Sequence, residues 1–316
     1  MNLKGIFRPS TRAFFSEARQ VKGYSFFDRL HGYVYGRWTY FYIGIGTGRH
    51  PLAKRLAPLL NWIGNLIVDN AAKGSAGPSI KWEDTYHGKV VPLEAARQLV
   101  SVKEDINLGD LEHVIPYALA RDIVLQHPDH IVVLDCPCRV ASEHPCLPLD
   151  VCLIVGEPFA SFVLEHHPQR SRQISSQEAQ DILLAEDRRG HVHHAFFKDA
   201  MLGRFYAICN CCACCCGAMR AQRSGTQMLA SSGYTAQVDE DLCLQCEKCV
   251  ENCQFSAVYM GETAVVDPAL CMGCGICVGQ CDSGAMKLVR MESKGEPLEI
   301  EAMIEAFNLK VQASVD

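Results

Sequence analysis

Apolar positions in the middle of the chain follow two different spacings, one typical of helices and one of strands. Helical spacing is found in residues 93–100 and 111–126, whereas short apolar runs typical of strands occupy residues 131–134 and 151–155. The mixture predicts a compact α/β region over residues 90–208.

A further helix can be placed by its cap and its stop. Ser175 and Glu178 have the spacing of a capping box, in which each side chain bonds to the other residue's backbone N–H. The helix that they open is expected to run to about Arg188, with Gly190 as its stop.

Different compositions flank this region on both sides. Residues 1–80 are basic and aromatic, and they include residues 73–78, a stretch with Gly, Ser and Pro that is typical of a linker. An internal repeat follows further on, and the chain ends in an acidic tail that we expect to be helical. We therefore divide the chain into an arm (1–80), a cysteine-rich α/β domain (81–235), a repeat domain (236–290) and the tail (291–316).

Neither a membrane span nor a secretory leader is expected. The best apolar runs, residues 38–45 and 56–68, fall short of the roughly 18 residues that a spanning helix needs. The first fifteen residues contain no apolar core of a signal peptide and no small-residue cleavage site. We therefore expect a cytoplasmic protein whose 18 cysteines are reduced and available to metal.

The net charge of −6 conceals an asymmetry. Residues 1–60 contain ten Lys and Arg but only two acidic residues, a balance of +8, and the remainder carries −14. A basic, aromatic arm on an acidic body predicts an anionic partner. The alternatives are peripheral attachment to the inner face of the membrane through residues 1–70, or an arm that wraps the chain or a partner subunit. No nucleic-acid motif accompanies the charge, so nucleic acid is not expected as a partner.

The repeat carries eight cysteines in two copies of the pattern C-x-x-C-x-x-C-x-x-x-C. Three cysteines of such a loop fit three irons of one cubane, and the fourth, at the start of a short helix, faces the other cluster. The spacing therefore predicts two [4Fe-4S] clusters with crossed ligands. The first takes Cys243, Cys246, Cys249 and Cys281, and the second takes Cys271, Cys274, Cys277 and Cys253. Zinc is the alternative, but the duplicated pattern is not zinc spacing.

This repeat resembles the bacterial two-cluster ferredoxin family over about 55 residues, with all eight ligand positions present. One departure is that Gln254 and Asp282 stand where the family usually has proline after the fourth cysteine. The change removes a rigid turn and no ligand. A buried Asp282 close to a cluster is also expected to shift its reduction potential through charge.

Ten further cysteines lie in two groups, each after an apolar run, and we expect the groups to meet at one edge of the sheet. Their number predicts one or two additional [4Fe-4S] clusters. The ten are Cys136, Cys138, Cys146, Cys152, Cys209, Cys211, Cys212, Cys214, Cys215 and Cys216.

Other interpretations of these ten cysteines stay open. Cys152 is also a good core residue, and Cys136, Cys138, Cys146 and one more are candidates for zinc. Vicinal cysteines are candidates for a redox disulfide. Six cysteines within the eight residues 209–216 nevertheless exceed any packing need, because alternate side chains point to opposite sides of the chain.

The combination of Cys136-Pro-Cys138-Arg139 with the cysteine burst at 209–216 looks like ferredoxin-like proteins of anaerobic bacteria, which carry a cysteine-rich domain before the dicluster module. The resemblance implies electron transfer. The run at 215–217 also looks faintly like heterodisulfide-reductase-type subunits, whose wider cysteine spacing is not reproduced.

The polar residues near these cysteines each allow a functional and a purely structural interpretation. Arg139 stabilises the negative charge of a cluster or is an ordinary surface arginine. His191, His193 and His194 are candidates for iron ligation or proton transfer, but a solvated strand is the expectation.

Together these patterns predict an α+β, multi-cluster protein, with a cysteine-rich α/β domain before a dicluster ferredoxin-like domain and a basic aromatic arm. It is expected to be a non-catalytic electron-transfer subunit of an oxidoreductase complex. One alternative is a reductase subunit whose 136–216 cysteines bind a cluster with an open iron. Another is an adaptor that docks an oxidoreductase at a membrane.

Overall fold

The computed structural model describes residues 8–53, 55, 86–109, 111, 114–116 and 122–313. The apolar run 56–68 and the linker 73–78 lie outside these residues, as do residues 112–113 and 117–121 of the predicted helix 111–126. The last four residues of that helix prediction are wrong, because Ile123–Asp135 form strand β3. This segment opens with β-branched residues, and its cross-strand pairing with β2 and β4 outweighs the helical spacing.

Eight strands form one sheet in the middle of the chain, in the order β2-β3-β4-β7-β6-β1-β8, with β5 paired to β3. Nearly all pairings are antiparallel, and β1 with β8 is parallel. The strands are β1 (Tyr86–Val90), β2 (Ile106–Leu108), β3, β4 (Asp150–Glu157), β5 (Ser171–Ile174), β6 (Val192–Lys198), β7 (Arg204–Cys211) and β8 (Leu229–Ala230).

Helices cover both faces of this sheet. The helices are α1 (Pro9–Ala18), α2 (Phe26–Arg37), α3 (Thr39–Gly46), α5 (Leu93–Leu99), α6 (Pro137–Val140), α7 (Phe159–His166), α8 (Ser176–Arg188) and α9 (Gly217–Arg223). One core contains buried residues of α1, α2, α7 and α9, and the other contains those of α5 and α8. Alternation along β4 places Cys152 and Ile154 in the first core and Leu153 in the second, so the strand directs Cys152 toward α7.

The predicted helices at 93–100 and 175–188 and the strands at 131–134 and 151–155 are confirmed. Ser175 caps α8 by accepting a hydrogen bond from the Glu178 N–H at 3.1 Å. Gly190 follows with φ +76°, the left-handed conformation that ends helices.

The described part of the basic arm packs against the α/β domain. Phe14 of α1 and Tyr35 of α2 are buried in the first core, and the Tyr35 hydroxyl lies 2.8 Å from that of Tyr206 on β7. Phe26 and Phe27 are 62% and 70% exposed, so an apolar surface is left on the outside. Attachment to a membrane or a partner stays a prediction. Within the described ranges, no helix is long and apolar enough to cross a membrane.

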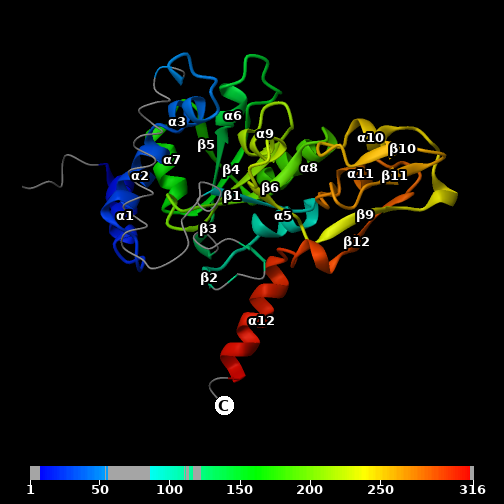
Figure 1. Cartoon of the computed structure of the whole chain (residues 1–316). Coiled ribbons are helices and arrows are strands. Elements are labelled where there is room, and N and C mark those ends of the chain that lie inside the picture. The colour runs from blue at the N-terminus through cyan, green and yellow to red at the C-terminus, as the bar shows by residue number, and fades with distance from the viewer. Residues whose placement is uncertain are drawn as a thin grey trace, which may run out of the picture.

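The repeat forms two small two-stranded sheets, β9 with β12 and β10 with β11. Figure 1 shows it in yellow and orange at one end of the molecule, with α1 near the opposite end. Its elements are β9 (Tyr234–Val238), α10 (Lys248–Glu251), β10 (Val258–Met260), β11 (Ala264–Val266), α11 (Ile276–Gly279) and β12 (Met286–Arg290). The tail contains the expected helix, α12 (Ile300–Ala313), and the fold as a whole is mixed α/β.

Candidate functional site

The eight cysteines of the repeat surround two cavities. A cavity of about 350 Å³ is lined by Cys253, Cys271, Cys274 and Cys277, and one of about 340 Å³ is lined by Cys243, Cys246, Cys249 and Cys281. Each cavity therefore takes three cysteines from one copy of the repeat and the fourth from the other copy. This grouping is that of the crossed sets, and ligation itself stays a prediction.

Tight backbone turns bring the cysteines of each copy together. Gln245 and Glu247 have φ values of +55° and +61° in the first copy, and Gly273 and Gly275 have +65° and +86° at the matching positions of the second. These left-handed residues curl the chain before the short helices α10 and α11. Backbone N–H groups then point at sulfur: Ala257 donates to Cys253 Sγ at 3.2 Å.

The two quartets differ in burial. Cys246 is exposed in the Cys243 quartet, whereas Cys271 and Cys277 are buried in the other. Burial raises the pKa of Cys277 to about 12. Because a thiol must lose its proton to bind metal, a cluster bound at this cysteine would have to supply the free energy that ionises the buried group.

Six of the ten further cysteines lie inside the α/β domain. Their side chains form a chain in which each thiol contacts the next, and the order is Cys136, Cys138, Cys216, Cys211, Cys209 and Cys152. All six line one mainly apolar cavity of about 780 Å³. They come from the ends of β4 and β7 and from the starts of α6 and α9, so the expectation that the two cysteine groups meet at one edge of the sheet is correct.

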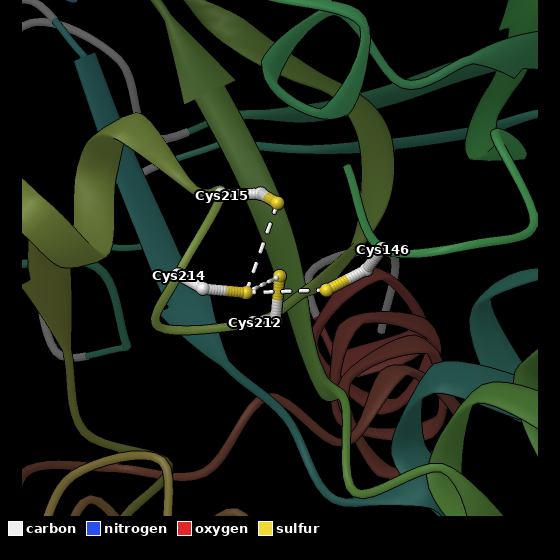
Figure 2. Close-up of side chains that lie close together, drawn as sticks. All are labelled: Cys146, Cys212, Cys214 and Cys215. Atoms are coloured by element: carbon white, nitrogen blue, oxygen red, sulfur yellow. Dashed lines mark hydrogen bonds between the residues drawn. The ribbon is translucent and has the colours of Figure 1, made fainter. Parts of the chain in front are cut away.

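The other four cysteines form a compact group in which Cys214 is exposed and Cys212 and Cys215 are buried (Figure 2). The sulfurs of Cys146, Cys212, Cys214 and Cys215 all lie within 4.8 Å of one another. Cys146 thus joins the burst, and it forms no such group with Cys136 and Cys138, the partners considered for it in a zinc site. Cys212 and Cys215 also line the interior cavity, so the two cysteine groups adjoin.

Arg49, just after α3, holds the two cysteine loops together. Its guanidinium donates to the carbonyl oxygens of Cys138, Cys214 and Cys215 at 3.0, 3.0 and 2.7 Å. The planar fork of arginine suits such simultaneous contacts. The sequence offered no signal for this role, since Arg49 is one of ten basic residues in the first 60.

Comparison with known families bears on the repeat. Residues 264–287 match the 4Fe-4S binding domain family. This segment is a 4Fe-4S binding domain of the ferredoxin type. The match contains Cys271, Cys274, Cys277 and Cys281 and indicates at least one [4Fe-4S] cluster in the chain. No curated protein matches the chain.

The two departures from the ferredoxin pattern have clear structural surroundings. Asp282 is not buried as expected: its side chain is 77% exposed and pairs with Lys248. Gln254 instead faces the α/β domain, and its Oε1 accepts the Ala213 N–H at 2.9 Å. The residue after Cys253 in the ferredoxin-type domain therefore contacts the cysteine burst directly.

Arg139 and the histidines are buried, which corrects the surface interpretations. Arg139 is 1% exposed and forms an ion pair with Glu186, whose other oxygen accepts from Arg189 at 2.8 Å. His191 Nδ1 lies 2.7 Å from Glu186. Burial opposes ionisation of Glu186, but the hydrogen bonds with His191 and Arg139 hold its pKa below the ordinary value.

His193 and His194 are fully buried on β6, so the expectation of a solvated strand is wrong. The reason is position, because β6 lies between β7 and β1 and α5 and α8 pack against it. His193 Nδ1 lies 2.6 Å from the Oδ1 of Asn210, the residue between Cys209 and Cys211 in the sequence. Burial lowers the pKa of His194 to about 3, so its imidazole is neutral.

Proposed function

We propose that the chain is an electron-relay subunit with two [4Fe-4S] clusters in residues 236–290 and one more in the α/β domain. The observation that carries the proposal is that three cavities are each lined by at least four cysteines. A [4Fe-4S] cluster held by thiolates supplies one-electron chemistry at a potential set by charge, burial and hydrogen bonds to sulfur. The interior six cysteines are the proposed source of ligands for the third cluster.

The chain's own residues order these sites from the surface inward. Leu244 is 72% exposed beside the Cys243 quartet, and Cys246 of that quartet is itself exposed, so solvent reaches this site. Phe255 and Met272 line the cavity of the Cys253 quartet and also pack against the core that contains the interior cysteines. Gln254 adds a hydrogen bond at the same junction. The protein therefore presents one site to a partner and keeps the other two behind it.

The competing function is a reductase subunit with an open iron. Besides Cys212 and Cys215, six thiols line the interior cavity, more than the four that close one cubane, and complete ligation favours relay over catalysis. The adaptor function is separable by experiment, because an adaptor would keep its binding partner with residues 1–70 alone.

Iron and acid-labile sulfide counts on anaerobically purified protein test this proposal. Two clusters in the ferredoxin-type domain and one in the interior require about twelve irons. A triple variant, Cys138→Ser, Cys211→Ser and Cys216→Ser, is expected to lose about four of them, because it leaves only Cys136, Cys152 and Cys209 of the interior group. A count of about eight that the triple variant leaves unchanged would remove the third cluster and leave the two ferredoxin-type clusters standing.

Crossed ligation predicts that each fourth cysteine protects the partner loop. In Cys253→Ala, we expect Cys271, Cys274 and Cys277 to become accessible to an alkylating reagent, because their cluster loses its fourth ligand. Cys243, Cys246 and Cys249 are expected to stay protected. Mass spectrometry of alkylated, digested protein reports each cysteine separately.

The matched variant is Cys281→Ala, for which the two sets of protected and modified cysteines should exchange. If each variant instead exposes the loop of its own copy, the clusters are not crossed.

A further inference from the structure

The sulfurs of Cys146, Cys212, Cys214 and Cys215 lie closer together than the four cysteine sulfurs that bind one cubane. Cys214 Sγ lies 3.1 Å from Cys146 Sγ, 3.1 Å from Cys212 Sγ and 3.7 Å from Cys215 Sγ. Among the described residues, this is the only group of three or more His, Cys, Asp or Glu ligands whose atoms all lie within 4.8 Å of one another. Neither quartet of the ferredoxin-type domain is that compact.

These distances fit one tetrahedral ion. Zinc binds thiolate at about 2.3 Å, which places the four sulfurs of a tetrahedral site about 3.8 Å apart. A cubane attaches each thiolate to a different iron, so its outer sulfurs stand farther from one another. The closer sequence spacing agrees with the smaller site, because Cys212, Cys214 and Cys215 fall within four residues, whereas the ferredoxin loops use C-x-x-C.

The surroundings also suit bound thiolates. Arg49 fixes the carbonyl groups of Cys214 and Cys215 and places its positive charge beside the loop. Such outer contacts orient metal ligands and are a usual part of metal sites.

We propose that Cys146, Cys212, Cys214 and Cys215 bind a single Zn²⁺ ion, separate from the iron–sulfur clusters. Four thiolates leave no open position, which is the coordination of structural zinc. The ion would join the loop that carries Cys146 to the turn between β7 and α9 (Figure 2). Since Cys212 and Cys215 also line the interior cavity, the site would fix one wall of that cavity.

Elemental analysis of the full chain, purified anaerobically without chelator, tests the proposal. We expect about one zinc per chain in the unmodified protein and a loss of at least tenfold in the double variant Cys146→Ser, Cys214→Ser. Iron is expected to be unchanged by that variant. In the control Cys152→Ser, zinc is expected to be retained whatever happens to iron, so this result is independent of the third cluster. Iron loss in the double variant, or no zinc in the unmodified protein, would overturn the assignment.

Alkylation of the unmodified protein gives a readout that does not depend on a variant folding. Cys214 is exposed, so as a free thiol it should react at once. Cys212 and Cys215 are buried with or without the ion, so Cys146 and Cys214 are the reporters. With zinc bound, we expect both to be protected, and a zinc chelator should make them reactive while the eight ferredoxin-type cysteines stay protected. Complete modification of Cys214 before any chelator is added would rule out the site.

Discussion

Replacing Arg139 with Met should lower the free energy of unfolding by about 3 kcal/mol or more, the range for removing one member of a buried ion pair. Glu186 has no exposed surface and would keep its negative charge beside fewer donors. The Asn210 carbonyl, 3.1 Å from Arg139, would lose its donor as well. Anaerobic urea denaturation, followed by far-ultraviolet circular dichroism and by the visible absorption of the clusters, measures the loss.

The chain offers a matched control in Arg189, which binds the other oxygen of the same carboxylate. Its side chain is 45% exposed, so water can take its place at the carboxylate, and Arg189→Ala should cost only about 1 kcal/mol, clearly less than Arg139→Met. Arg139→Met is also expected to reduce iron in the interior site, because Arg139 directly follows Cys138. Equal effects of the two substitutions would mean that burial does not govern this pair.

Gly273→Ala is expected to disrupt the second ferredoxin-type loop. A Cβ atom at this position would lie 2.2 Å from the Tyr234 carbonyl oxygen and 2.3 Å from Ser232 Oγ. Both the positive φ and the backbone of β9 oppose it, so the expected destabilisation exceeds about 4 kcal/mol, which few single substitutions reach. We expect loss of about four irons from the Cys253 quartet, measured by iron analysis and visible absorption.

Gly275→Ala separates the cost of positive φ from the cost of the backbone clash. Gly275 also has positive φ, but the nearest atom to an added Cβ is the flexible end of Leu288 at 3.3 Å. Its cost should be that of the left-handed conformation alone, about 1–2 kcal/mol, with iron retained. Gln245 already occupies the position equivalent to Gly273 with φ +55°, which shows that a side chain is tolerated where no backbone approaches. Retention of iron in Gly273→Ala would contradict the steric argument.

Sequence patterns predicted those features that depend on local spacing. The two copies of the cysteine pattern predicted the loops of the repeat, and the apolar run 151–155 predicted the strand that carries Cys152. Helix 175–188 followed from its cap and its stop. These signals lie within a few residues of one another, so no knowledge of the tertiary fold was needed.

Features that depend on long-range contacts could not be predicted in this way. The run with His193 and His194 predicted a solvated strand, but β6 lies between two neighbouring strands and both side chains are buried. The ten cysteines divide into six that line the interior cavity and the compact group of Cys146, Cys212, Cys214 and Cys215. This division depends on how β4, β7 and the loops that carry Cys146 and residues 212–216 pack together. Arg49 and Gln254 bind backbone groups far away in the sequence, and such contacts leave no periodic pattern.

The ferredoxin-type domain is anchored to the α/β domain at both of its ends. Before β9, the Ser232 hydroxyl donates to the Gly273 carbonyl at 2.7 Å, and after β12, Leu298 and Ile300 are buried in the second core. The buried Lys89 donates to the Glu296 carbonyl at 2.7 Å, which adds a third tie. A domain fixed in this way does not swing between partners on a tether. Under the proposed relay function, electron exchange would therefore require the partner to dock on a domain whose position is fixed.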